Sequence, residues 1–252
     1  MYTRAVDLKR LKFITDILKD SIPESGNILD IGCGNGNISI HLGSQGFNVL
    51  GVDISEKAIN TANQNNSYSN VSFNAIGAEE LVTSGTSYDA IICSEVLEHL
   101  SEPENLLITI SLLLKHNGKL IITVPNGNGP REALMTKPMQ WMRRKNNFFW
   151  KITKIVKRGL GYDGKTVQSD ADDLEHIHFF TKKSLSKMAH QHKYKISKFE
   201  NADFIEDLFP FSLITKRIGF LQRLDCLVAD VLPHQLTGGF HTLWEKSETN
   251  QQ

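Results

Sequence analysis

Two carboxylates and an imidazole lie close together in the sequence, at Glu95, Glu98 and His99. If residues 95–99 form a helical turn, the three side chains share one face, because positions three and four apart are neighbours on a helix. Such a group can do two kinds of chemistry. His99 can take the proton from a hydroxyl group, since histidine titrates near neutral pH. Alternatively, the three side chains can bind a divalent cation that makes a hydroxyl group more acidic.

A glycine-rich segment, Gly32-Cys-Gly-Asn-Gly36, follows a short apolar run over residues 27–31 and precedes a helical pattern. Glycine at positions 32 and 34 lets the backbone lie directly against a ligand, because no Cβ atom holds the ligand away. A second apolar run ends at Asp53, 21 residues after Gly32. From that position a carboxylate can bind the hydroxyl groups of a ribose. The two segments predict a site for a nucleoside-containing cofactor.

The spacing of the glycines distinguishes between cofactors. A dinucleotide fingerprint, G-x-G-x-x-G, would place its third glycine at position 37, which is Asn37. Here the third glycine is Gly36, so an NAD-dependent oxidoreductase is the disfavoured alternative. The start of the following helix can still face an anion such as a carboxylate, because the helix dipole is positive there.

The elements that must position these residues alternate between strand and helix. Strands are predicted over residues 27–31, 48–53, 71–75, 88–93, 118–124, 195–199 and 239–245, and helices over 4–20, 36–45, 55–65, 103–115 and 181–192. This alternation predicts an α/β fold with a parallel sheet and crossover helices. Ligands of such sheets bind beyond the carboxyl ends of the strands, which is where Gly32, Asp53 and Glu95 are expected.

Composition disfavours several classes of protein. Basic and acidic residues balance, with 28 of each, so no charge excess favours nucleic acid as a partner. The three cysteines are scattered, without the paired spacing of a disulfide framework or a zinc site. The sequence has no apolar signal segment and no apolar run approaching the ~20 residues of a membrane span. We expect a cytoplasmic protein without a transmembrane segment.

Residues 131–165 differ from the rest of the chain, because ten basic residues stand there against two acids. Aromatic side chains are interleaved with the charges, among them Trp141, Phe148, Phe149 and Trp150. The segment can be a lid whose apolar face packs on the sheet while its lysines face solvent. It can also be an interfacial helix in peripheral contact with an anionic membrane, or a clamp for a phosphate-bearing or lipid-linked acceptor.

Four segments carry a resemblance to a known family: Ile28-Leu-Asp-Ile-Gly-Cys-Gly-Asn-Gly36, Val52-Asp-Ile-Ser55, residues 88–100 and residues 112–125. They resemble the class I S-adenosylmethionine-dependent methyltransferases, and most nearly the branch that contains the ubiquinone-biosynthesis O-methyltransferases. The resemblance implies a Rossmann-like, seven-stranded, mostly parallel sheet whose antiparallel seventh strand lies between the fifth and the sixth. As a single methyltransferase domain, the chain then comprises an N-terminal helix (1–20), a cofactor-binding core (21–125), a basic amphipathic lid insertion (126–175) and a C-terminal part of the sheet (176–252) with a helical insertion at 203–236.

The resemblance also assigns cofactor contacts. The residues that it places around S-adenosylmethionine are Asp30, Gly32, Cys33, Gly34, Gly36, Asp53, Ile54, Ala78, Glu79, Ser94 and Glu95. Asp30 and the glycines would lie at the methionine end, and Asp53 at the ribose. One position departs from the family, because Gly77 stands where an acid often meets the adenine amino group. That contact would then pass to Ala78 and Glu79.

The spacing E-x-x-E-H over 95–99, with a later H-x-x-x-F-T over 176–181, carries a second implication. It resembles the spacing in small-RNA 2′-O-methyltransferases and ubiquinone-pathway O-methyltransferases, in which two Glu and two His hold a metal ion. The match implies a divalent cation bound by Glu95, Glu98, His99 and His176, with His178 as a neighbour. Mixed carboxylate and imidazole donors suit Mg²⁺ or Mn²⁺, and Zn²⁺ and Fe²⁺ are open alternatives. By the same match, the catalytic residues are Glu98, His99 and His176.

The sequence therefore predicts an S-adenosylmethionine-dependent methyltransferase that methylates an oxygen atom of a small-molecule, glycan or lipid-linked acceptor. A hydroxyl acceptor needs a base or a metal ion, because its proton is weakly acidic, whereas an unprotonated amine needs far less help. Two alternatives remain open. One is an NAD-dependent oxidoreductase, and the other is a non-catalytic, S-adenosylmethionine-binding regulatory protein.

Overall fold

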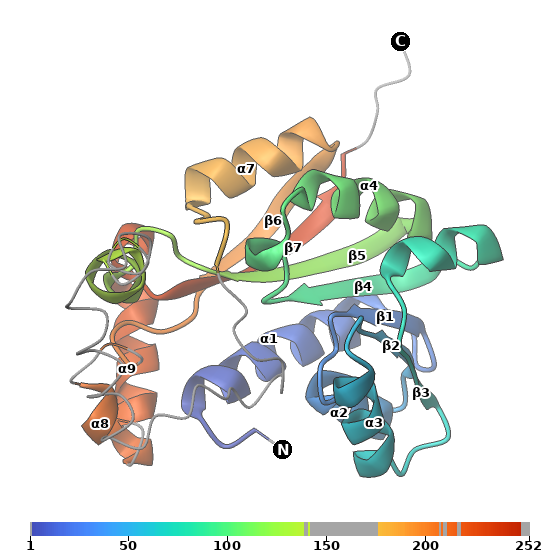
Figure 1. The fold of residues 1–252 in the computed structure, drawn as a ribbon, viewed down its shortest axis with the longest axis horizontal. Coiled ribbons are helices and arrows are strands. Elements are labelled where there is room, and N and C mark those ends of the chain that lie inside the picture. The colour runs from blue at the N-terminus through green and yellow to red at the C-terminus, as the bar shows by residue number, and fades with distance from the viewer. Residues whose placement is uncertain are drawn as a thin grey trace.

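The structure is a computed structural model, and it describes residues 2–138, 141, 176–206, 208, 211–215 and 218–247. Within these residues, seven strands form one sheet in the order β3-β2-β1-β4-β5-β7-β6 (Figure 1). The strands are β1 (Asn27–Ile31), β2 (Asn48–Val52), β3 (Val71–Asn74), β4 (Tyr88–Ser94), β5 (Leu114–Pro125), β6 (Tyr194–Asn201) and β7 (Gly239–Lys246). Beyond residue 138, the predicted lid over 126–175 lies outside the described residues, apart from Trp141.

The strand directions confirm the predicted fold class. β1 runs parallel to β2 and β4, β3 runs parallel to β2, and β5 runs parallel to β4. β7 lies between β5 and β6 and is antiparallel to both. The central strands are mainly apolar because both faces of the sheet are covered, and Ile91, Ile92 and Cys93 of β4 are fully buried.

Helices cover both faces of the sheet (Figure 1). They include α1 (Ala5–Ser21), α2 (Asn37–Ser44), α3 (Glu56–Asn65), α4 (Pro103–Leu113) and α7 (Lys182–Gln191). Ile14 of α1 and Leu42 of α2 belong to the core on one face, together with Ile28 of β1. Leu107 of α4 and Leu185 of α7 belong to the core on the other face. Because both faces are covered by helices, ligands are expected beyond the carboxyl ends of the strands.

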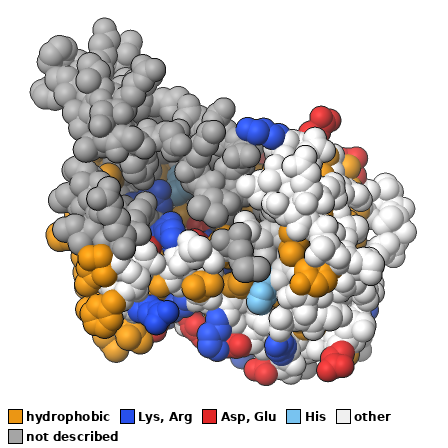
Figure 2. All heavy atoms as spheres, turned by 90° about the horizontal axis from the view of Figure 1, so that it is seen from below, with side chains coloured by type: hydrophobic (Ala, Val, Ile, Leu, Met, Phe, Trp, Pro, Cys, Tyr) orange, Lys and Arg blue, Asp and Glu red, His pale blue; other side chains and the backbone are white. Residues whose placement is uncertain are grey.

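The predicted helical insertion over 203–236 contains, in its described part, α8 (Ser212–Thr215) and α9 (Gly219–Val231). α9 packs beside α1, where Lys9 Nζ donates a 2.6 Å hydrogen bond to Asp230 Oδ1. Phe220, Leu227 and Val231 of α9 are exposed apolar side chains. Figure 2 shows hydrophobic side chains gathered at the lower left of the face that it draws. Among the described residues, no helix combines the length and the hydrophobicity needed to cross a membrane.

Most element boundaries lie within two residues of the prediction, and the largest difference is at the junction of α4 and β5. The helix expected to continue to residue 115 ends at Leu113, and β5 begins at Leu114 rather than at Gly118. Leu114 is buried and pairs with Tyr88 of β4, before the register shifts and Lys119 pairs with Ala90. The helix therefore ends where Leu114 becomes buried against β4, two residues before its predicted end.

Candidate active site

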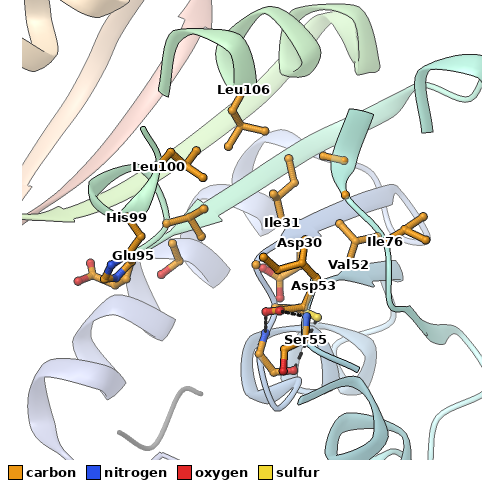
Figure 3. A pocket seen from close by; sticks show the side chains of 18 of the residues that line it. Asp30, Ile31, Val52, Asp53, Ser55, Ile76, Glu95, His99, Leu100 and Leu106 are labelled. Atoms are coloured by element: carbon orange, nitrogen blue, oxygen red, sulfur yellow. Dashed lines mark hydrogen bonds between the residues drawn. The ribbon is translucent and has the colours of Figure 1, made fainter. Parts of the chain in front are cut away.

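A cavity of about 720 Å³ lies at the carboxyl ends of β1, β2 and β4 (Figure 3). This volume is within the range of small-molecule and cofactor sites. Ten of the eleven predicted cofactor contacts line it: Asp30, Gly32, Cys33, Gly34, Asp53, Ile54, Ala78, Glu79, Ser94 and Glu95. The eleventh, Gly36, is not among the described lining residues. Its φ is +78°, and a Cβ there would come 2.7 Å from the ring of Phe73, so Gly36 permits close packing of the loop.

Asp53 fastens the glycine loop to the end of β2. Its Oδ2 accepts a 2.9 Å hydrogen bond from the backbone N–H of Gly34, and its Oδ1 accepts a 2.8 Å bond from Ser55 N–H. Gly32 and Gly34 have φ values of +68° and +52°, in the left-handed region that favours glycine. The loop backbone and the Asp53 carboxylate therefore lie together on the cavity wall, as the two sequence segments predicted.

Asp30 lies on β1 beneath this loop and is 1% exposed. Its Oδ2 accepts a 2.5 Å hydrogen bond from Ser39 Oγ of α2. Burial raises the pKa of Asp30 to about 7, with a further contribution from the charge of Asp53, although the Ser39 hydrogen bond opposes the shift. A cationic group of a ligand in the cavity would favour the charged form of Asp30.

The raised pKa of Asp30 predicts a pH dependence of stability. In an unfolded chain, aspartate has a pKa of about 3.9. Between about pH 4 and 7, Asp30 therefore keeps a proton in the folded protein that it has released in the unfolded chain. The free energy of unfolding therefore falls as the pH rises through this window. Asp30→Asn should remove this fall, which amounts to roughly 4 kcal/mol at most at neutral pH.

Urea denaturation of the ligand-free protein across this pH window measures the effect. Asp20→Asn, at an exposed position of α1, is the matched control and should behave like the unchanged protein. If Asp30→Asn and the unchanged protein lose stability equally as the pH rises, Asp30 does not titrate in this range.

A second part of the cavity wall is mostly apolar. Ile76 and Ala78 line it after β3, and Leu100 and Leu106 line it near the start of α4 (Figure 3). A Cβ at Gly77 would overlap the carboxylate of Glu79, so the Glu79 side chain lies over the position where the sequence lacks an acid. An acid is thus present beside Gly77, and adenine contact by Ala78 and Glu79 stays a prediction.

The predicted helical turn over 95–99 is wrong in its first part. A 3₁₀ turn, η2, spans Leu97–His99, and Glu95 precedes it with a φ of +58°. Glu95 Oε1 accepts a 2.8 Å hydrogen bond from Thr123 Oγ1 of β5 and lies 3.6 Å from the guanidinium of Arg10. Because β5 and α1 hold its carboxylate, Glu95 lines the cavity without joining Glu98 and His99 as a potential ligand.

Glu98, His99 and His176 come together as the sequence predicted. One potential ligand atom from each lies within 4.8 Å of the other two. His99 Nε2 is 3.7 Å from Glu98 Oε1, and the ring centroids of His99 and His176 are 5.1 Å apart. His99 also lines the cavity, so one member of this three-residue cluster lies on the cavity wall.

Backbone contacts bring His176 to η2 from a distant part of the chain. The N–H groups of Ile177 and His178 donate hydrogen bonds of 2.7 and 3.0 Å to the carbonyl oxygen of Glu98. The His178 ring turns away, with Nε2 placed 3.2 Å from the carbonyl oxygen of Ser101. The position of His176 therefore depends on the backbone of the cluster's own Glu98.

Glu98 has an unusual environment for an acid. It is 1% exposed, and neither of its carboxylate oxygens has a hydrogen-bond partner among the described residues. Burial, and after it the charge of Glu95, raises the pKa of Glu98 well above its ordinary value. Burying a charged carboxylate without partners is unfavourable. A cation between Glu98 and the two histidines would remove that penalty, so the three residues fit a metal ion.

Sequence analysis missed Glu132, which lies at the start of a π-helical turn, η3 (Glu132–Thr136). Glu132 is 1% exposed, and its Oε1 is 3.3 Å from His176 Nδ1. Burial acts to raise the pKa of Glu132, but His176, Arg131 and Thr136 outweigh it and leave this pKa below its ordinary value. The sequence did contain a signal for Glu132: residues 131–165 hold ten basic residues and only two acids, and Glu132 is one of these acids.

The fold and the site together define a class of protein. A glycine loop after β1, an acid after β2 and an antiparallel β7 between β5 and β6 make a Rossmann-like domain with a cavity at the carboxyl ends of its strands. A family model described as a methyltransferase domain matches residues 2–198. The chain belongs to this methyltransferase family, as its sequence motifs predicted.

Relatives of known function extend the comparison. The chain is 37% identical over 108 residues to the ubiquinone biosynthesis O-methyltransferase of Rickettsia akari, which covers 42% of this chain and 43% of the relative. It is 34% identical over 119 residues to the mitochondrial enzyme of that name from Schizosaccharomyces pombe, covering 45% and 43%. The matched region thus spans about half the length of the curated relatives or somewhat less.

Solved structures share the fold at low identity. Magnesium protoporphyrin IX methyltransferase from Synechocystis, solved with bound S-adenosylhomocysteine, has a TM-score of 0.56 and 16% identity, covering 96% of this chain and 84% of that one. An S-adenosylmethionine-dependent methyltransferase from Archaeoglobus fulgidus has a TM-score of 0.58 and 16% identity, covering 96% and 95%. These likenesses support the Rossmann-like methyltransferase fold.

Proposed function

We propose that the protein transfers the methyl group of S-adenosylmethionine to an oxygen atom of a small-molecule, glycan or lipid-linked acceptor. The position of His99 carries this proposal, because His99 lines the cavity and also belongs to the Glu98–His99–His176 cluster. The names of the curated relatives, which are O-methyltransferases, support an oxygen acceptor. The neutral overall charge disfavours nucleic acid.

The cavity residues would bind and orient the cofactor. Gly32 and Gly34 would lie against the methionine end, and Asp30 would attract its amino group. Asp53 would accept hydrogen bonds from the ribose hydroxyls, while Ala78 and Glu79 would contact the adenine. Bound in this way, the cofactor supplies an electrophilic methyl group. The protein's main contribution is then to align the acceptor with that group.

Glu98, His99 and His176 would hold a divalent cation, Mg²⁺ or Mn²⁺. The buried carboxylate oxygens of Glu98, which lack hydrogen-bond partners among the described residues, support this proposal. A cation in such a site makes a bound hydroxyl more acidic. Without a cation, His99 would be the general base that takes the hydroxyl proton.

The described start of the basic insertion (residues 131–138 and 141) would contribute to the surface that meets the acceptor. Leu134 and Trp141 are more than half exposed there. Exposed apolar side chains beside basic residues suit a hydrophobic or lipid-linked acceptor, or peripheral contact with a membrane. Most of residues 131–165 lie outside the described residues, so this assignment rests on the sequence pattern.

Chelation separates the two forms of the proposal. Purified protein is incubated with S-adenosylmethionine and pools of phenols, sugars, lipid-linked glycans and amines, and S-adenosylhomocysteine production is measured with and without EDTA. We expect turnover with a hydroxyl acceptor, abolition by EDTA and recovery with added Mg²⁺ or Mn²⁺. Full activity in EDTA would show that no cation is needed, and His99 would then be the base. Cofactor binding without turnover in any pool would favour a regulatory, non-catalytic protein.

A further inference from the structure

The contact between Glu132 and His176 has no role in the function as proposed so far. Glu132 Oε1 lies 3.3 Å from His176 Nδ1, and both side chains are largely withdrawn from solvent, with exposures of 1% and 16%. Arg131 and Thr136 also interact with this carboxylate and, together with His176, favour its charged form. A buried acid needs such neighbours, the imidazole of His176 among them, to compensate for lost hydration.

Glu132 lies beside the Glu98–His99–His176 cluster but does not belong to it. Glu98, His99 and His176 offer ligand atoms within 4.8 Å of one another, and Glu132 is outside that set. It approaches His176 at Nδ1. A carboxylate at one ring nitrogen of histidine keeps the proton on that nitrogen and leaves the other nitrogen as the donor to a metal ion or a proton.

We infer that Glu132 is a positioning residue, which holds Nδ1–H of His176 so that Nε2 serves the Glu98–His99–His176 cluster. The inference rests on the proposed function of that cluster. It also explains why a buried acid stands in the otherwise basic insertion. Glu95 does not supply this contact, because Thr123 and Arg10 engage its carboxylate.

Two variants separate positioning from packing. Glu132→Met keeps a side chain of similar volume but removes the carboxylate, whereas Glu132→Gln keeps an oxygen that can accept the Nδ1–H bond. Glu104→Met, at an exposed position of α4, is the control for an unrelated acid. Affinity for S-adenosylhomocysteine checks that each variant is folded, and it should stay close to that of the unchanged protein.

The first readout is Mn²⁺ affinity, measured by calorimetry. Loss of an outer-shell partner of a metal-binding histidine typically weakens metal binding about 10- to 100-fold, and we expect this for Glu132→Met. Glu132→Gln should recover much of the affinity. Unchanged Mn²⁺ affinity in Glu132→Met would overturn the inference. No Mn²⁺ binding by the unchanged protein would instead contradict the proposed cation site.

The second readout decides the inference even if no cation binds. Long-range ¹H–¹⁵N correlation spectra report which nitrogen of His176 carries the proton. We expect Nδ1–H in the unchanged protein and in Glu132→Gln, and a shift of the proton toward Nε2 in Glu132→Met. The same tautomer in all three proteins would overturn the inference, whatever the cation measurement gives.

Discussion

Changing His99 to alanine is expected to lower kcat for methyl transfer at least about 100-fold, the lower end of what general acid–base catalysis contributes. The imidazole lies both on the cavity wall and in the cluster with Glu98 and His176, so its loss removes either the base or a cation ligand. Affinity for S-adenosylhomocysteine should change little. Rates of S-adenosylhomocysteine production at saturating acceptor, together with calorimetry, measure both quantities.

His190→Ala is the matched control, because His190 is exposed on α7. This variant should retain the kcat of the unchanged protein. Full activity in His99→Ala would contradict activation of a hydroxyl by His99. If His176→Ala were also fully active, the argument for an oxygen acceptor would fail as a whole.

Changing Asp53 to alanine is expected to weaken binding of S-adenosylmethionine about 100-fold. Hydrogen bonds to a charged group each contribute about 1.5 to 3 kcal/mol, and a loss of about 3 kcal/mol corresponds to roughly a hundredfold change in Kd. The loss has two sources. Asp53 would no longer bind the ribose hydroxyls, and it would no longer hold Gly34 N–H and Ser55 N–H.

Asp53→Asn should give an intermediate Kd, since the amide keeps one acceptor oxygen of the two. Glu56→Gln, at an exposed position in the first turn of α3, tests whether loss of any nearby charge has the same effect. Calorimetric titration of the three variants makes the comparison. An unchanged Kd in Asp53→Ala would show that Asp53 has no part in cofactor binding.

The parts of the fold that sequence predicted well depend on local patterns. β1, β2 and β4 are mostly buried, so their residues form short, mainly apolar runs that are visible without a structure. The glycine loop was predictable because positive φ values at Gly32 and Gly34 require residues without a Cβ atom. The prediction of the ten residues that line the cavity came from these two features and from the resemblance.

The parts that sequence did not predict depend on contacts between distant segments. Spacing alone places Glu95 beside Glu98, but the backbone at Glu95 is left-handed and its carboxylate meets Arg10 of α1 and Thr123 of β5. The sequence of residues 95–99 alone does not predict these two contacts. Glu132 was missed for the same reason, because its partner His176 follows a long insertion.

Calorimetric titration of the unchanged protein with S-adenosylmethionine, S-adenosylhomocysteine and NAD tests the central claim most directly. The cavity, the G-x-G-x-G loop and Asp53 predict that both adenosyl compounds bind with one-to-one stoichiometry and more tightly than NAD. Tighter binding of NAD than of S-adenosylmethionine, or no binding of either adenosyl compound, would contradict a methyltransferase function for this protein.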